Sequence, residues 1–79
     1  MTTSVYHITI AKKIREYRKE NKLSQRAFGR RIGVSAQVVC KWEQSLCYPD
    51  IFFLPILARI LQCTIDDFFD AEKETNEYK

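Results

Sequence analysis

The sequence has little glycine or proline, a single histidine and no long apolar stretch. Its 79 residues include two glycines, two prolines and one histidine. This composition excludes a collagen-like or linker-like chain. No apolar run approaches the roughly 18 residues of a membrane-spanning helix, and the N-terminal residues lack the basic and apolar regions of a secretory signal. We therefore expect one small domain that works in the cytoplasm.

The cysteines also exclude several kinds of site. Cys40, Cys47 and Cys63 form an odd, well-separated set, which is unlike a disulfide framework. Zinc ligands usually come in close pairs, but no Cys-x-x-Cys is present and His7 is the only histidine. There is also no glycine-rich phosphate loop or nucleophile–base pattern. We expect reduced thiols, no metal, no cofactor and no enzymatic activity.

Charge is distributed unevenly along the chain. Residues 1–45 contain ten Lys or Arg and three Asp or Glu, whereas residues 46–79 contain three Lys or Arg and seven Asp or Glu. A basic half joined to an acidic half is typical of a protein with one surface that faces a polyanion. Two solvated faces of a small domain would give the same distribution, so charge alone leaves both interpretations open.

The first helix is indicated by apolar spacing. Ile10, Ile14 and Tyr17 recur at i, i+4 and i+7 with charged residues between them, which is typical of an amphipathic helix. We predict a helix over about residues 9–21, with Thr9 as a candidate N-cap.

Two short helices follow, separated by a tight turn. Ser24 is a strong N-cap candidate, and Gly33 is placed to end the helix that it starts. Ser35 is the next N-cap candidate and opens a helix over about residues 36–44. A three-residue Gly-Val-Ser turn favours two helices that cross steeply.

The rest of the domain is predicted from apolar runs and caps. Residues 51–62 are predicted to form a fourth helix. Because Pro55 lacks a backbone donor, either the regular helix begins near Leu54 or its first turn is irregular. Thr64 caps a short fifth helix over residues 65–70, with Ile65, Phe68 and Phe69 facing inward. No strand is indicated. The predicted division is an N-terminal arm (1–8), a helical domain (9–70) and a charged tail (71–79).

Several short motifs, in this order and spacing, resemble the phage Cro/cI-repressor-like helix-turn-helix (XRE) family. They are Ile14-Arg15-Glu16-Tyr17-Arg18, Leu23-Ser24-Gln25, Ile32-Gly33-Val34-Ser35, Lys41-Trp42-Glu43, Pro49-Asp50 and Leu57-Ala58-Arg59-Ile60-Leu61. The resemblance covers about residues 9–70. It implies an all-α, compact five-helix, lambda-repressor-like fold in which helices two and three form the DNA-binding pair.

The resemblance implies that the third helix reads DNA bases in the major groove. The implied base-contact residues are Ser35, Ala36, Gln37, Cys40 and Lys41. An amide such as that of Gln37 can pair with adenine, and Lys41 can reach guanine or a phosphate. Ala36 and Cys40 offer only small apolar contacts, so a base contact that many relatives make with a longer side chain is missing here.

Further residues are implied to hold the DNA backbone or the fold. The candidate backbone contacts are Lys12, Lys13, Gln25, Arg26, Gln44 and Tyr48. Either Arg30 or Arg31 could face DNA. Arg18 and Glu43 match family positions that form a partly buried ion pair between the first and third helices. Trp42 is expected in the core, and Gly29 where the second and third helices pack closely.

These features predict a sequence-specific regulator of transcription, most simply a repressor that binds a double-stranded DNA operator as a homodimer. Leu46, Phe52 and Phe53 exceed what so small a core can bury, so we expect self-association after the third helix or through the fifth. The alternative is an antitoxin or interaction module that holds a protein partner with its acidic C-terminal half. We expect no membrane association.

Overall fold

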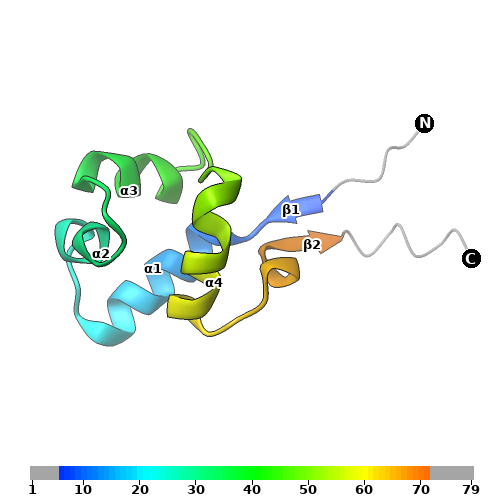
Figure 1. Cartoon of the computed structure of the whole chain (residues 1–79), viewed down its shortest axis with the longest axis horizontal. Coiled ribbons are helices and arrows are strands. Elements are labelled where there is room, and N and C mark those ends of the chain that lie inside the picture. Colours follow the sequence, from blue (N-terminus) through cyan, green and yellow to red (C-terminus); the bar gives the residue numbers. More distant parts are fainter. Residues whose placement is uncertain (1–5, 72–79) are drawn as a thin grey trace, which may run out of the picture.

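The computed structural model describes residues 6–71. Within this range it contains four α-helices, two short 3-10 helices and a two-stranded sheet. The elements in chain order are β1 (Tyr6–Ile8), α1 (Ile10–Asn21), α2 (Gln25–Ile32), α3 (Ala36–Glu43), η1 (Ile51–Phe53), α4 (Leu54–Leu61), η2 (Ile65–Phe68) and β2 (Phe69–Ala71). Figure 1 shows the helices gathered at one end of the molecule and the two strands extending from the other.

The α2–turn–α3 segment forms as the sequence predicts. The Ser24 hydroxyl accepts a hydrogen bond from the backbone N–H of Ala27, and the Ser35 hydroxyl accepts one from that of Val38. Each serine therefore satisfies one of the free donors at a helix N-terminus. Gly33 ends α2 with φ of 86°, a left-handed conformation that is strained for most other residues.

Thr9 occupies the predicted N-cap position of α1, but its side chain does not cap the helix. Its hydroxyl instead donates to the carbonyl oxygen of Asp67 (2.8 Å), and its backbone N–H donates to that of Phe68 (2.9 Å). Thr9 therefore fastens the start of α1 to η2, a role that depends on residues far away in the sequence.

Pro55 explains the irregular start of the fourth helix. Residues 51–53 form the 3-10 helix η1, and Pro55 lies in the first turn of α4. A proline is tolerated there because that backbone N–H has no partner within the helix. The regular helix thus begins at Leu54, as one of the two alternatives predicted, and a 3-10 turn precedes it.

The predicted fifth helix and the predicted absence of strands are both wrong. Only η2 forms after Thr64, and β2 then pairs antiparallel with β1, Tyr6 opposite Ala71 and Ile8 opposite Phe69. The described chain is therefore all-α apart from this strand pair, with four α-helices and the 3-10 turn η2 in place of the fifth helix. The cap at Thr64 is confirmed, since Thr64 and Asp67 form a reciprocal capping box.

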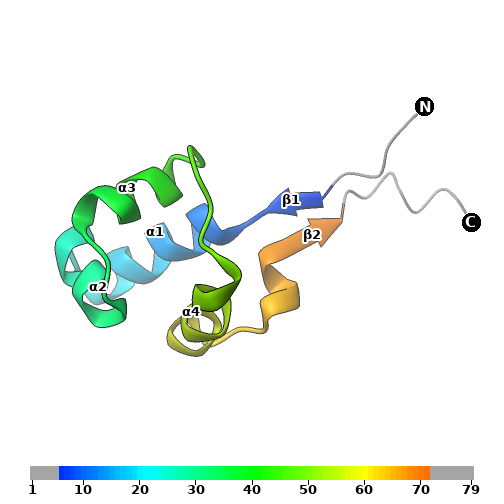
Figure 2. The ribbon, with the colours of Figure 1, turned by 45° about the horizontal axis from the view of Figure 1, so that its top comes forward.

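The two strands include residues that the sequence places in the N-terminal arm and in the C-terminal tail. Residues 6–8 of the predicted arm pair with residues 69–71, and Figure 2 shows the two strands side by side from a second direction. Residues 1–5 and 72–79 of the arm and tail lie outside the described residues, and the predicted division of the chain stays a prediction. Of the three residues predicted to face inward here, Phe68 is fully buried, whereas Ile65 and Phe69 are 38% and 39% exposed.

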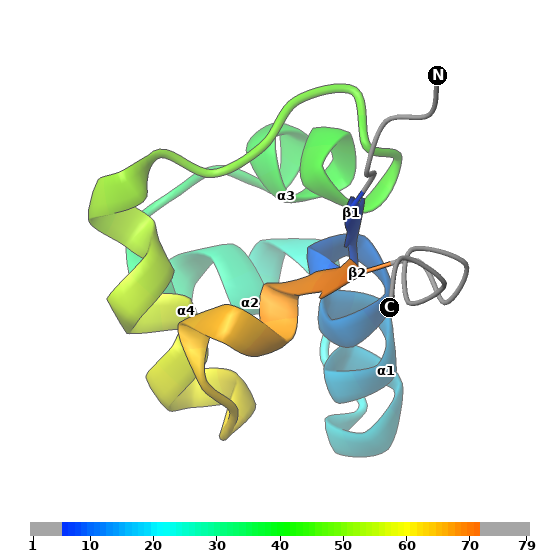
Figure 3. The same ribbon diagram turned by 90° about the vertical axis from the view of Figure 1, so that its right-hand side faces the viewer.

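A single core joins the four α-helices and η2. Its largest fully buried side chains are those of Ile14, Phe28, Val39, Leu57 and Phe68. Trp42 is 4% exposed, which confirms it as a core residue. Figure 3 shows α3 lying across α1 and α2, with α4 on the opposite side from α1. This arrangement leaves the outer face of α3 uncovered by the other described helices.

Candidate nucleic-acid interface

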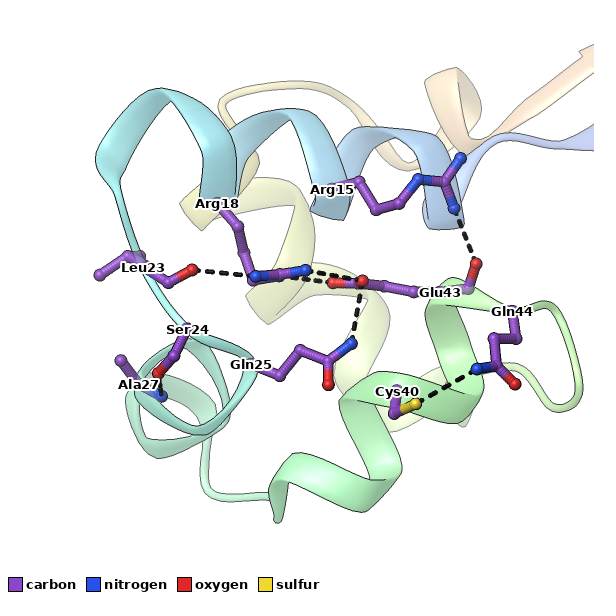
Figure 4. Close-up of polar contacts among 9 residues, drawn as sticks. All are labelled: Arg15, Arg18, Leu23, Ser24, Gln25, Ala27, Cys40, Glu43 and Gln44. Carbon is purple, nitrogen blue, oxygen red and sulfur yellow. Dashed lines mark hydrogen bonds and ion pairs between the residues drawn. The ribbon is translucent and has the colours of Figure 1, made fainter.

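The position of α3 is fixed by Glu43, the last residue of that helix. Arg18 on α1 donates to the Glu43 carboxylate through Nε (2.6 Å) and Nη2 (2.9 Å), as Figure 4 shows. The Glu43 side chain is 6% exposed and that of Arg18 is 22% exposed. These hydrogen bonds raise the pKa of the Arg18 guanidinium above its usual value. The implied ion pair is thus present, with the bidentate geometry that makes such pairs specific.

Two further contacts complete a polar cluster around Glu43. The Gln25 amide Nε2 donates to Glu43 Oε1 (3.1 Å), and Arg15 Nη1 donates to the Glu43 carbonyl oxygen (2.7 Å). Arg18 Nη1 also donates to the carbonyl oxygen of Leu23 (3.0 Å), just before α2 begins. The C-terminal end of α3 is therefore held by α1 and by the first residue of α2. We call Arg15, Arg18, Gln25 and Glu43 the Glu43 cluster.

Close packing sets the angle between α2 and α3. A Cβ placed on Gly29 would overlap the carbonyl oxygen of Val34 and would lie 3.3 Å from that of Ser35. A side chain at this position would force the turn to shift, which confirms the expected close packing of the two helices. The absence of a side chain lets the turn fold back against α2.

The structure places the five predicted base-contact residues on or beside one face of α3. Ser35, Gln37 and Lys41 are exposed, whereas Ala36 and Cys40 are half-buried. The hydroxyl of Ser35 is occupied as an N-cap, and the thiol of Cys40 accepts a weak hydrogen bond from Gln44 (3.4 Å). Gln37 and Lys41 are therefore the longest polar side chains on this face that no other described residue holds.

The two adjacent arginines of α2, Arg30 and Arg31, lie on different sides of that helix. Arg30 lines a hollow of about 460 Å³ with Arg26, next to residues 34–37 at the start of α3. Arg31 instead donates to the hydroxyl of Tyr17 (3.2 Å). Arg30 thus lies beside α3 and Arg31 lies on the α1 side of α2. Which of them faces DNA stays a prediction.

The two adjacent lysines of α1 separate as well. Lys12 lies in a basic groove with Arg15 and Arg18, whereas Lys13 lies beside Tyr17 and Leu61. Lys13 is also close enough to Cys63 and Asp67 to affect their pKa values electrostatically. The structure therefore does not bring Lys13 together with the other predicted backbone contacts.

Arg15 is the residue of the Glu43 cluster whose role sequence reasoning missed. Its acceptor is a backbone carbonyl, which has no signature in the sequence. The available signal was its spacing from Arg18, since residues three apart are neighbours on one helix face.

The N-termini of α1, α2 and α3 share an electrostatic feature. None of the three has an acidic residue in its first turn, whereas η2 has Asp66 and Asp67 there. Acidic residues normally stabilise a helix N-terminus by opposing the positive end of the dipole. Their absence leaves free N–H groups and a positive potential that suit phosphate oxygens.

The loop after α3 exposes apolar side chains. Leu46, Tyr48, Ile51 and Phe52 are 68%, 54%, 76% and 71% exposed, and we call these four residues the apolar patch. Phe53 is only half-buried, but its ring packs edge-on against Trp42 at a centroid distance of 5.7 Å. The expectation that Leu46, Phe52 and Phe53 cannot all be buried is therefore confirmed.

Other kinds of site find no support in the described part of the chain. Among the side chains that the structure describes, those of residues 8–69, no group of three or more His, Cys, Asp or Glu could hold a metal ion. Cys40, Cys47 and Cys63 are free thiols. Among the described helices, none has the length and apolar character needed to cross a membrane.

The steeply packed pair α2–α3, with an uncovered outer face on α3, defines a helix-turn-helix domain. The chain belongs to the helix-turn-helix family, whose model matches residues 14–68, and the resemblance drawn from the sequence is thereby confirmed. Repressor protein C2 of Salmonella phage P22 is 37% identical over 57 residues, which cover 72% of this chain and 26% of that protein. The chain thus spans about a quarter of the length of this relative. Helix-turn-helix repressors are a non-enzymatic family.

Two solved structures of the P22 protein resemble this fold. The crystal structure of the c2 repressor in complex with the synthetic operator 9T, in the presence of Tl⁺, matches with a TM-score of 0.67 at 36% identity. This match covers 75% of the present chain and 89% of the P22 repressor chain in that crystal structure. The solution structure of the c2 repressor DNA-binding domain matches with a TM-score of 0.64 at 34% identity, covering 86% and 84% of the two chains.

Proposed function

We propose that the protein is a sequence-specific, double-stranded DNA-binding repressor of transcription that acts in the cytoplasm. The observation that carries this proposal is the Glu43 cluster, which fixes α3 while Gln37 and Lys41 remain exposed on its outer face. A rigidly held helix with free polar side chains is what base reading in the major groove requires. Similarity to a repressor crystallised with an operator supports the same function.

In this proposal the side chains near α3 divide into two groups. Gln37 pairs with an adenine and Lys41 with a guanine or a phosphate, while Ser35, Ala36 and Cys40 lie against the base edges. Backbone phosphates are held from both sides of α3. The candidates are Lys12, Gln25, Arg26, Arg30, Gln44 and Tyr48, which are all exposed except Gln25.

We also propose that the protein binds as a homodimer through the apolar patch. Its four side chains are 54–76% exposed, and an exposed apolar patch on a small protein commonly marks an interface. Four side chains are few for a stable interface. Such a dimer would assemble chiefly on DNA, with half-sites about 34 Å apart.

The function is tested by selecting duplexes from a random-sequence library with the purified protein. We expect an enriched pseudo-palindrome whose binding survives excess unrelated duplex. Gln37→Ala should lose preference at one base pair in each half-site, by about 1–3 kcal/mol. Gln62→Asn, which alters an exposed glutamine at the end of α4, should leave the preference intact. Failure to enrich any sequence would contradict the proposal.

The dimer is tested separately by changing the apolar patch. Phe52→Ser should abolish cooperative binding to the two half-sites while a single half-site is still bound. Ile65→Ser is the matched control, because Ile65 is exposed on η2 and outside the patch. Equal cooperativity in both variants would place the interface elsewhere.

The alternative role, a protein partner held by the acidic C-terminal half, is favoured by one observation. Asp50, Asp66 and Asp67 are exposed and none forms an ion pair with another described residue. Co-expression with the product of a neighbouring gene, followed by gel filtration, distinguishes this role from simple repression. Antitoxin function requires a stable complex with a basic protein.

A further inference from the structure

The outer face of α1 carries a basic groove next to the Glu43 cluster. The groove has a volume of about 680 Å³ and is lined by Lys12, Arg15, Glu16, Arg18, Lys19, Lys22 and Leu23. Five of these seven residues are basic and one is acidic. Arg18 is neutralised by Glu43, so the remaining three lysines and Arg15 outweigh Glu16 and leave the groove strongly positive.

The clustering of these charges opposes the stability of α1. Lys12, Arg15, Lys19 and Lys22 follow one another at spacings of three or four residues, so like charges are neighbours on the helix surface. Lys12 also lies in the first turn of α1, which has no acidic residue. A cation there is disfavoured by the helix dipole, whereas Lys19 in the last turn and Lys22 at the C-cap are favoured by it. A bound polyanion would therefore relieve the repulsion between neighbouring cations and the cost of Lys12 at the N-terminus.

The groove adjoins the base-reading helix directly. Arg15 lines the groove and donates to the carbonyl oxygen of Glu43, the last residue of α3. Figure 4 shows Arg15 and Arg18 of α1 and Gln25 of α2 converging on Glu43 at the end of α3. An α-helix about 10–12 Å wide fills the major groove of DNA, so the two sugar-phosphate strands must pass on either side of α3.

We propose that this groove holds the sugar-phosphate strand that passes α3 on the α1 side, with Lys19 and Lys22 as phosphate contacts beyond those of α2 and α3. This inference rests on the proposed DNA-binding function. Arg15 links the two surfaces, because it holds the end of α3 and faces the same strand. The contact adds affinity for any duplex and no base preference.

The experiment measures salt-dependent binding of Lys19→Gln/Lys22→Gln to the selected duplex and to a scrambled duplex. Each lost phosphate contact lowers the slope of log affinity against log salt by about 0.9, so the slope should fall by about 1.8. Affinity should fall roughly 50-fold near 0.1 M salt for both duplexes. Ethylation of individual phosphates should stop interfering at a subset of positions on one strand of each half-site.

The matched control for the single variant Lys22→Gln is Arg59→Gln. It removes one charge from an exposed position in the last turn of α4, outside the groove. Its salt slope and interference pattern should equal those of the wild type. Lys19→Arg/Lys22→Arg should retain binding, and circular dichroism melts of all variants show whether they fold.

The outcomes separate this inference from the proposed function. Equal loss in Lys22→Gln and Arg59→Gln would mean a general effect of net charge, and no loss in either would mean that the groove is unoccupied; both results overturn the inference. If the wild type does not discriminate the selected from the scrambled duplex, the proposed function fails. In that case the salt dependence of binding to the scrambled duplex still tests whether the groove contacts phosphates.

Discussion

Replacing Glu43 with glutamine should unfold the protein at a much lower temperature. The substitution keeps the shape of the side chain but removes the charge that accepts two hydrogen bonds from Arg18 and one from Gln25. Removing one partner of a buried ion pair costs about 3–5 kcal/mol. Arg18 is 22% exposed and can regain some water, so we expect a loss of about 2–4 kcal/mol. For a domain of this size that loss lowers Tm by about 10–25 °C.

The assay is thermal and urea unfolding of four proteins that form a double-mutant cycle. These are the wild type, Arg18→Met, Glu43→Gln and the double variant. The double variant should lose less stability than the two single variants together, because it leaves no buried charge without a partner. A loss below about 0.5 kcal/mol for Glu43→Gln, or simple additivity in the cycle, would refute the argument that the pair holds α3 in place.

Three further predictions concern other parts of the molecule. Gly29→Ala should destabilise the domain by about 1–3 kcal/mol in urea unfolding, because the added Cβ overlaps the carbonyl oxygen of Val34; equal or higher stability would show that the turn yields freely. Thr64, chiefly through its backbone N–H, lowers the pKa of Asp67 below its usual 3.8. The ionised carboxylate therefore stabilises the folded state above pH 3.8, and this contribution to stability is lost as the pH falls below that value. Asp67→Asn should therefore lower Tm at pH 7 and leave it nearly unchanged at pH 2; an unchanged Tm at pH 7 would contradict this. In a variant whose other two cysteines are serine, bound duplex should slow alkylation of Cys40 by a maleimide, and equal rates with and without DNA would place Cys40 outside the interface.

The parts of the fold that the sequence predicts well are those determined by neighbouring residues. Ser24, Gly33 and Ser35 define the ends of α2 and α3 through hydrogen bonds or backbone conformations that lie within a few residues. Pro55 likewise determines where α4 can begin. Such signals are local, so no tertiary structure is needed to interpret them.

The errors come from elements whose stability depends on distant contacts. Strands of three residues show no alternation that could reveal them, and β1 exists only because β2 pairs with it. The segment after Thr64 has the acids and apolar spacing of a helix start, but four residues gain too few hydrogen bonds to continue as an α-helix. Phe68 is buried and Phe69 is half-exposed because the chain switches to a strand between them.

The sequence predicts which helices form the candidate site, but it predicts fewer of the individual side-chain contacts. The ion pair of Arg18 with Glu43 followed from the resemblance, and the structure adds Gln25 to the same carboxylate. Lys12 and Lys13 are both predicted backbone contacts. Because one residue of an α-helix turns the side chain by about 100°, the two lysines lie on different faces of α1. The only sequence signal for the bond from Arg15 to a backbone carbonyl is the three-residue spacing of Arg15 from Arg18.

The pairing of β1 with β2 brings the two ends of the described chain together. It joins Tyr6 to Ala71, so nearly the whole described chain forms one closed loop, and closing a long loop costs entropy that only a completed interior repays. The strand pair should therefore form last and open first. Hydrogen exchange at the amide of Thr9, which donates to the carbonyl oxygen of Phe68, would report the fraying of this closure well before the helices themselves unfold.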